Sequence, residues 1–360
     1  MECYVHTVGV TGSIPVAPTI ASTPVNHRAA ITFRGIPWGV TGSIPVAPTI
    51  FPIAATIPSP CYKVATDNQG DVLMSRWKKR REGLRAILEG EACVHPASVH
   101  DPVSVRIAED LGFEMGMYAG SVASLTVLGA PDLIVLTLSE FASQGHRISR
   151  ASALPVLADA DHGYGNALNV MRTVEELEAA GIAGLTIEDT ALPQNFGSGG
   201  KPALIALEEG VGKIKAALDA RDDANLVIAG RTSAAAITSM DDAIARAKAY
   251  EGAGADAIFM LGLKNRADIE TAAAALSRPL IVSGTGPDFE DRAWLASQNV
   301  RICLQGHQPF AAATQAIYAT MKALREGTPP ADLTNLASKE LRASASRAGD
   351  YAERIRRYLD

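Results

Sequence analysis

From Cys93 to about Arg325, short runs rich in Val, Ile and Leu alternate with segments of helical periodicity. We expect eight strands, at residues 93–99, 114–120, 155–159, 184–189, 226–232, 257–262, 280–284 and 301–306. Strands that alternate with helices form parallel βαβ units, and unbroken apolar strands indicate a sheet buried on both faces. Eight units predict an α/β fold of the (β/α)8, TIM-type barrel class. A doubly wound open sheet is the alternative, but no GxGxxG motif follows a first strand to support dinucleotide binding.

The helical segments carry recognisable end signals. After Asn166, Val170 and Leu177 fall on one face of a helix with a period of 3.6 residues. Ser239, with Asp242 three residues later, predicts a capping box at the start of another helix.

The composition favours a small molecule as the partner. The chain has 360 residues and a formal net charge of −6, with a pI near 5.7 and charges mixed along the chain. This balance predicts neither nucleic-acid binding nor attraction to an anionic membrane, and we find no uninterrupted apolar stretch long enough for a transmembrane helix. Four cysteines without a CxxC pair are not the pattern of a disulfide framework, so we expect a reducing, cytoplasmic setting.

The first 73 residues differ from the rest of the chain. The stretch GVTGSIPVAPTI occurs twice, at residues 9–20 and 39–50, and Glu2 is the only acidic residue before Asp67. A segment so rich in Pro and Thr does not readily build a packed core. We therefore expect residues 1–73 to be a low-complexity extension that is disordered or non-native, and residues 74–360 to form the barrel domain with C-terminal helices. A targeting peptide and a partner-binding arm are the alternatives for the extension.

Polar residues gather at the expected ends of the strands. In a barrel of this class, the C-terminal ends of the strands and the loops after them line the active site. The residues at these positions are Ser121, Asp159, Asp161, Glu188, Asp189, Arg231 and His307. They are far apart in the sequence, yet the predicted fold brings them to one rim.

Asp159, Asp161 and Glu188 form an acidic cluster that needs a counter-charge. Close carboxylates repel one another unless a cation neutralises them, and oxygen ligands without Cys or paired His favour Mg²⁺, with Mn²⁺ also possible. Mg²⁺ keeps several of its waters, so we expect Asp159 to bind the metal directly and the other acids to act through water. Helix capping and surface ion pairs are the alternative role for these acids.

Three further residues could contact a substrate. Arg231 ends an apolar strand, where its buried charge requires an acidic partner, and its planar group suits a substrate carboxylate; a salt bridge to a rim acid is the alternative. His307 could donate a hydrogen bond or a proton, with a structural hydrogen bond as the alternative. Ser121 could offer its hydroxyl and N–H to an oxyanion, and a plain turn serine is the alternative. We expect His162 to be a hydrogen-bonding loop residue rather than a metal ligand.

Together these residues resemble the isocitrate lyase and phosphoenolpyruvate mutase superfamily. The stretch LADADHGYGNALNVMRTVEELEAAGIAGLTIEDT, at residues 157–190, is similar to its oxaloacetate decarboxylase branch, as are IAGRTSA at 228–234 and LQGHQPF at 304–310. The resemblance runs from about Leu84 to the C-terminus. It implies a (β/α)8 barrel whose last helix is exchanged between subunits, in a homodimer or homotetramer.

The resemblance also implies an active site built on Mg²⁺ and a small 2-oxo dicarboxylate. Asp159 matches the direct metal ligand of the family's DxD motif, and Asp161 and Glu188 match acids that hold metal-bound waters. The residues that match substrate-binding positions are Ser121, Arg231 and His307.

The expected reaction is the Mg²⁺-dependent decarboxylation of oxaloacetate to pyruvate and CO₂ through a metal-bound enolpyruvate, with Arg231 and His307 as the catalytic residues. One alternative is another superfamily lyase, which would cleave a carbon–carbon or carbon–phosphorus bond of a substituted malate or a phosphonopyruvate-like acid. A barrel that binds a metal–dicarboxylate complex without catalysis is the alternative of a different class.

Two departures from the family pattern bear on the substrate. The carbon–carbon lyases of the superfamily carry a catalytic cysteine after the fourth strand, whereas the loop at residues 190–204 has none, which argues against that route. The stretch SGTGPD, at residues 283–288, lacks the tyrosine that the decarboxylase branch has there. The 190–204 loop is long and rich in Gly and Ser, which predicts a mobile lid or a disordered loop.

Overall fold

The computed structural model describes the backbone of residues 68–360 and the side chains of residues 77–360. These residues belong to the second of two units of the chain, Tyr62–Asp360. The predicted extension, residues 1–73, lies outside the described residues except where the first helix begins at Asn68, and its nature stays a prediction. No helix within residues 68–360 combines the length and the apolar character needed to cross a bilayer.

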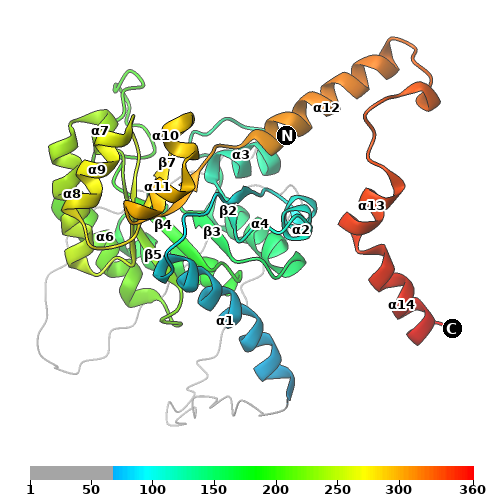
Figure 1. Cartoon of the computed structure of the whole chain (residues 1–360), viewed down its shortest axis with the longest axis horizontal. Helices are drawn as coiled ribbons and strands as arrows, with labels where there is room; N and C mark the ends of the chain where they lie inside the picture. Colours follow the sequence, from blue (N-terminus) through cyan, green and yellow to red (C-terminus); the bar gives the residue numbers. More distant parts are fainter. Residues whose placement is uncertain (1–67) are drawn as a thin grey trace, which may run out of the picture. The chain divides into compact units, whose positions relative to one another are not determined.

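Eight parallel strands form one sheet, and each strand pairs with the next along the chain. Their bounds are β1 Ala97–Ser98, β2 Gly116–Tyr118, β3 Val156–Asp159, β4 Gly184–Glu188, β5 Val227–Thr232, β6 Ala257–Met260, β7 Leu280–Ser283 and β8 Val300–Leu304. Just before β1, Val94 forms a parallel bridge with Ile302 of β8. The backbone N–H of Val94 donates to Arg301 O and that of Cys303 donates to Val94 O, both at 2.9 Å, so the sheet closes on itself. The predicted (β/α)8 barrel is confirmed (Figure 1).

Most of the helices lie between successive strands and cover the outside of the barrel (Figure 1). Up to β8 they are α1 Asn68–Glu89, α2 Pro102–Asp110, α3 Gly120–Leu128, α4 Leu138–Ala151, α5 Ala167–Ala179, α6 Leu207–Ala220, α7 Ala234–Ile237, α8 Met240–Ala253, α9 Arg266–Ala275, α10 Pro287–Glu290 and α11 Arg292–Ser297. After β8 come α12 Gln308–Arg325, a 3-10 turn at Pro330–Asp332, α13 Lys339–Ser346 and α14 Ala348–Tyr358.

The helix ends agree with the predicted signals, with one correction. Asn166 caps α5, and Val170 and Leu177 on the predicted face are buried. Ser239 caps α8, where its side chain accepts from the N–H of Asp242 at 3.2 Å. The reciprocal half of the predicted capping box is wrong, because the Asp242 carboxylate accepts from the Thr238 hydroxyl and from Arg246 instead.

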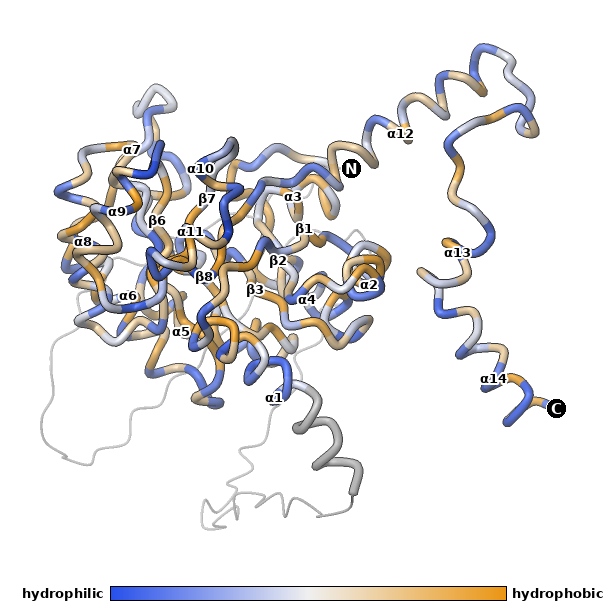
Figure 2. The backbone as a smooth tube through the Cα atoms, viewed as in Figure 1, coloured by the Kyte–Doolittle hydropathy of each residue, from blue (hydrophilic) through white to orange (hydrophobic). Residues whose placement is uncertain are grey.

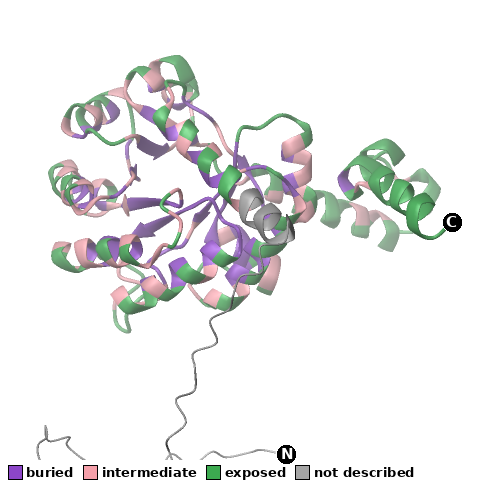
Figure 3. Cartoon of the chain, turned by 90° about the horizontal axis from the view of Figure 1, so that it is seen from below, coloured by how far each residue is buried: buried purple, intermediate pink, exposed green. Residues whose placement is uncertain are grey.

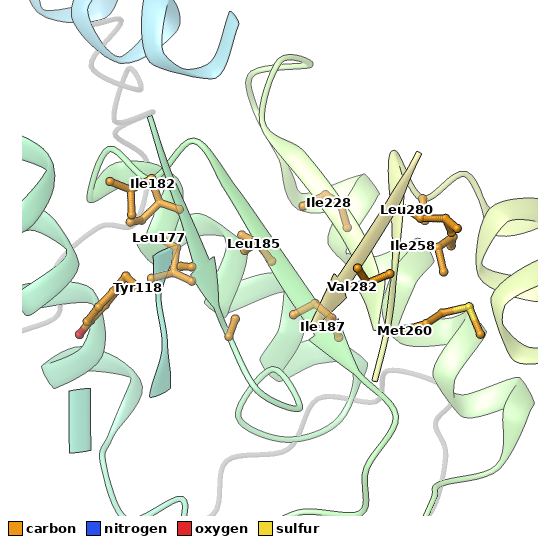
Figure 4. Close-up of a cluster of buried hydrophobic side chains, with 14 of the residues drawn as sticks. Tyr118, Leu177, Ile182, Leu185, Ile187, Ile228, Ile258, Met260, Leu280 and Val282 are labelled. Carbon is orange, nitrogen blue, oxygen red and sulfur yellow. The ribbon is translucent and has the colours of Figure 1, made fainter. Parts of the chain in front are cut away.

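The core has two parts because side chains alternate between the two faces of a strand. In β5, Val227 and Ala229 belong to the cluster inside the barrel, together with Leu84 of α1. Ile228, between them, belongs to the layer between the sheet and the helices, part of which is drawn in Figure 4. Figure 3 shows the strands buried and the outer sides of the helices exposed. The same alternation places Arg231, two residues beyond Ala229, on the inner face at the C-terminal end of β5.

Candidate active site

A cavity of about 490 Å³ lies at the C-terminal ends of the strands. Six of the residues predicted for the rim line it, namely Ser121, Asp159, Asp161, Glu188, Arg231 and His307. Each lies at the end of a strand or in the segment that directly follows one. The barrel therefore brings together side chains that are far apart in the sequence.

Strand register explains why β3, β4 and β5 supply the charged centre. Glu188 is paired with Arg231, and Asp159 is paired with Thr186, across neighbouring strands. The Thr186 hydroxyl, which is fully buried, donates to Asp159 Oδ1 at 3.0 Å. Paired residues on parallel strands project to the same face, so this pairing alone places the acids beside the arginine.

Arg231 forms ion pairs with two of the predicted metal-site acids. Its Nη1 lies 2.5 Å from Asp159 Oδ2 and its Nη2 lies 3.2 Å from Glu188 Oε2. Burial favours a lower pKa for Arg231, but the carboxylates of Asp159 and Glu188 outweigh it and raise that pKa. The salt bridge stated above as the alternative role of Arg231 is thus present, and its contact with a substrate stays a prediction.

Asp161 and Glu188 are held close together in a buried place. Asp161 has a φ of +49°, and a Cβ at residue 120 would lie 2.6 Å from its Oδ2, so Gly120 is what leaves room for this carboxylate. Burial, and then the charges of Asp159 and Glu188, raise the pKa of Asp161. Burial also raises the pKa of Glu188, although Arg231 acts against it. The acids therefore resist ionising together unless positive charge is added.

The donor set fits a hard divalent cation. Within residues 77–360, no group of three or more His, Cys, Asp or Glu side chains is placed so that it could hold a metal ion. Mg²⁺ keeps several of its waters in protein sites, so it needs few direct protein ligands. The oxygens of Asp159, Asp161 and Glu188 line one cavity and would be relieved of mutual repulsion by such an ion.

His307 and Ser121 also line the cavity. In the sequence, Ser121 comes before the charged residues of the site and His307 comes after them. His307 directly precedes α12, and its Nδ1 lies 2.8 Å from Ser98 Oγ. Burial lowers the pKa of His307, while Asp159 and Asp132 act in the other direction. Ser121 is the second residue of α3, whose N-cap residue, Ala119, makes no side-chain hydrogen bond. The Asp161 carboxylate lies beside Gly120, the first residue of this helix.

Asp132 and Ser98 are polar lining residues that were not predicted from the sequence. Asp132 lies in the loop between α3 and α4, and burial followed by the charge of Asp159 raises its pKa. Ser98 is the last residue of β1 and also lines the cavity. Its place at a strand end was a usable signal, whereas the loop of Asp132 has no periodicity that could have placed it.

Two residues singled out in the sequence lie away from the cavity lining. Asp189 is 1% exposed and accepts from the Tyr250 hydroxyl at 2.7 Å and from Arg246 at 3.2 Å, because it follows Glu188 and so faces the other side of the sheet. Its expected place among the rim acids is therefore wrong. His162 is buried, and its backbone carbonyl accepts from Lys213 Nζ at 3.0 Å, whereas its ring Nδ1 has no hydrogen-bond partner in the described part of the chain.

The loop at residues 190–204 begins and ends as a short antiparallel pair. Thr190 and Leu204 form a bridge, and the Ala191 N–H donates to Ala203 O at 2.8 Å. Leu192, Pro193 and Gln194, just beyond this stem, line the cavity. The loop therefore borders the site, and its movement as a lid stays a prediction.

Known proteins match this chain in both sequence and structure. Residues 84–325 match the family model described as phosphoenolpyruvate phosphomutase. A relative from Rhodopseudomonas palustris (strain BisB18), named oxaloacetate decarboxylase, is 60% identical over 283 residues, which cover 79% of this chain and 98% of the relative. A phosphoenolpyruvate phosphomutase from Streptomyces platensis subsp. rosaceus is similar in structure, with a TM-score of 0.70 and 29% identity over 78% of this chain and 99% of that one.

A second solved structure is a phosphonopyruvate hydrolase in complex with oxalate and Mg²⁺, with a TM-score of 0.69 and 28% identity. The match covers 78% of this chain and 99% of that one. The family model spans most of the barrel, and the sequence relative is covered almost entirely. The chain therefore belongs to the isocitrate lyase and phosphoenolpyruvate mutase superfamily, in the family of the relatives named oxaloacetate decarboxylase.

Proposed function

We propose that the chain is an oxaloacetate decarboxylase, a carboxy-lyase that converts oxaloacetate into pyruvate and CO₂ with the help of Mg²⁺. The observation that carries the proposal is the cavity of about 490 Å³ in which acidic side chains and Arg231 surround a space suited to a small oxo acid. The identity of 60% to a relative of that name supports the choice of substrate.

Decarboxylation requires a site that binds the substrate dianion and stabilises the negative charge that develops on the enolate. When CO₂ leaves from C4, the electron pair of the broken bond moves to C3 and onto the C2 oxygen as an enolate. A bound Mg²⁺, held directly by Asp159 and through water by Asp161 and Glu188, would supply a Lewis acid for this charge. Donors from Ser121 and Arg231 would hold the oxo acid, and preorganised donors of this kind are often worth about 3 kcal/mol each.

No general base is needed for this reaction. Loss of CO₂ creates the enolate without removal of a proton, so a loop at residues 190–204 without cysteine is compatible with it. His307 would orient the leaving carboxylate or assist protonation at C3. Its lowered pKa, caused by burial, favours a neutral ring that can donate one hydrogen bond.

Pyruvate release from oxaloacetate tests the proposal. Free divalent ions also decarboxylate oxaloacetate, so the rate with Mg²⁺ alone is subtracted. We expect Asp159→Ala, and excess EDTA, to abolish the enzymatic rate, whereas Asp241→Ala, which removes an exposed acid from α8, should retain it. Full activity of Asp159→Ala would contradict the metal assignment.

A substrate panel separates this function from its alternatives. Turnover of 2-methylisocitrate or phosphonopyruvate in preference to oxaloacetate would assign the chain to another lyase activity of the superfamily. Binding of oxalate with Mg²⁺, without a rate above that of the metal ion, would instead indicate a barrel that only binds.

We also propose that α12 is exchanged between two copies of the chain, in a homodimer or in a homotetramer built from such pairs. No residue of α12 is buried, and Ile317, Tyr318 and Met321 are more than half exposed; Figure 2 shows apolar and polar residues alternating along this helix. A groove of about 760 Å³ beside α2, lined by Ile107 and Leu111 among others, offers apolar surface for the α12 of a second copy. Sedimentation of the double variant Ile317→Glu, Met321→Glu should show monomers. A mass equal to that of the native oligomer would contradict the exchange.

The cysteines support a reducing, cytoplasmic setting as part of the proposal. Within the described residues, Cys93 and Cys303 are both free and buried. Burial raises the pKa of Cys93 to about 11 and that of Cys303 to about 12, so neither thiol ionises readily at neutral pH.

A further inference from the structure

The imidazole of His307 is held by a residue from the other end of the barrel domain. Ser98 Oγ lies 2.8 Å from His307 Nδ1, although the two residues are 209 positions apart. Ser98 ends β1 and His307 follows β8, and these strands meet where the Val94–Ile302 bridge closes the barrel. Both side chains line the cavity, and Ser98 is buried.

This contact determines which ring nitrogen is available to a substrate. A neutral imidazole carries one N–H donor and one acceptor nitrogen, and the bond made by one nitrogen selects the role of the other. Among residues 77–360, Ser98 is the one hydrogen-bond partner of the His307 ring. If the hydroxyl donates to Nδ1, the ring proton lies on Nε2.

The chemistry of the cavity favours this arrangement. A 2-oxo dicarboxylate presents only acceptor oxygens, so it gains a hydrogen bond from Nε2–H and none from a bare Nε2. Burial lowers the pKa of His307, and a ring that is neutral has a single proton to place. We propose that Ser98 is a positioning residue, which donates to His307 Nδ1 and thereby keeps the ring oriented with Nε2–H toward the substrate. The inference rests on the proposed function, because it assumes that His307 meets an anionic oxo acid.

A purely structural role for the hydroxyl is distinguishable. The backbone of this segment is already paired, since Ser98 is in register with Met117 and the Val99 N–H donates to Met117 O at 2.9 Å. Ser98→Ala should therefore keep the barrel folded and change only the histidine. Ser149→Ala is the matched control, because it removes another buried serine hydroxyl, one without a hydrogen-bond partner in the described part of the chain.

Kinetics provide the first arm of the test. Misplacement of a group in an active site by about 1 Å can cost about 100-fold in rate, so we expect Ser98→Ala to lower kcat at least about 10-fold and Ser98→Thr to restore most of it. In a His307→Gln background, Ser98→Ala should add no further loss, because it acts through the ring. Equal losses in both backgrounds, or a similar loss in Ser149→Ala, would overturn the proposal.

The second arm reads the histidine itself, without turnover. In protein labelled with ¹⁵N-histidine, the signals of His307 are those that disappear in His307→Gln, and their ¹⁵N shifts report which nitrogen is protonated. We expect Nε2–H in the native protein and a mixture of both tautomers in Ser98→Ala. A proton on Nδ1 in the native protein would overturn the role of Ser98 whatever the enzyme does. If the native protein carries the proton on Nε2 but does not decarboxylate oxaloacetate, the role of Ser98 stands and the proposed function is contradicted.

Discussion

Replacement of Arg231 by methionine tests whether the acids of the cavity depend on its positive charge. The guanidinium lies 3.2 Å from Glu188 Oε2 and closer still to Asp159, and the Arg231 side chain is only 14% exposed. At an effective dielectric constant of about 20, one pair at 3.2 Å has a gross Coulomb energy of about 5 kcal/mol. Removing one partner of a buried pair costs about 3–5 kcal/mol net. We expect Arg231→Met to lower the free energy of unfolding by about 3–5 kcal/mol at pH 7.5 in EDTA.

The loss of stability should shrink at lower pH. Burial already raises the pKa of Glu188 and of Asp161 in the folded protein, and removal of Arg231 raises them further. The folded variant then binds more protons than the unfolded chain, so its stability falls as the pH rises through the folded pKa values. The difference from the native protein should therefore be smaller at pH 5.5 than at pH 7.5.

Mg²⁺ should replace part of the missing charge. An ion at 100 times its Kd adds about 2.7 kcal/mol to the free energy of unfolding. At one fixed Mg²⁺ concentration the gain should be larger in Arg231→Met than in the native protein, because the uncompensated acids of the variant bind the ion more tightly. Arg246→Met is the matched control, because Arg246 pairs with buried Asp189 at 3.2 Å outside the cavity. It should lose stability, and Mg²⁺ should stabilise it no more than it stabilises the native protein. Urea unfolding followed by circular dichroism measures each variant, and equal recovery of both, or no loss in Arg231→Met, would refute the reasoning.

Three other changes have defined outcomes. Gly120→Ala places a methyl group 2.6 Å from Asp161 Oδ2, so this carboxylate must move; we expect kcat/KM for oxaloacetate to fall at least about 10-fold, and an unchanged value would contradict the role of Asp161. Tyr250→Phe removes the 2.7 Å hydrogen bond to Asp189, which should lower the free energy of unfolding by about 1–3 kcal/mol, visible as a lower urea midpoint. Burial raises the pKa of Cys303 to about 12, so iodoacetamide at pH 8 should leave it unmodified in native protein and alkylate it in urea, as read by peptide mass spectrometry.

The fold was predictable because its signals are local. Each strand is a short apolar run, and each begins and ends within a few residues of its predicted position, from Ala97 in β1 to Leu304 in β8. The helix caps at Asn166 and Ser239 were equally readable, since a cap depends on residues within one turn. The wrong half of the Ser239 capping box has a different origin. The Asp242 carboxylate accepts from Arg246, one helical turn onward, and not from the backbone N–H of the cap residue Ser239.

The site was predictable to the extent that strand ends define it. Asp159, Glu188 and Arg231 could be placed at one rim from topology alone. The error over Asp189 was avoidable, because the period of two along a strand already puts it on the face opposite Glu188. Asp132 had no such signal, since it lies in a loop whose path depends on the packing of α3 and α4.

Local patterns in this chain specify eight strands, their order and the residues at their ends, because propensity and periodicity act over a few residues. Local patterns do not specify which side chains pair with one another. The pairing of Arg231 with Asp159, and the contact of Ser98 with His307 across the closed barrel, join residues that no local pattern relates. Which charge neutralises which, and which ring nitrogen of His307 is engaged by Ser98, follow from distances of about 3 Å that exist only once the sheet has closed.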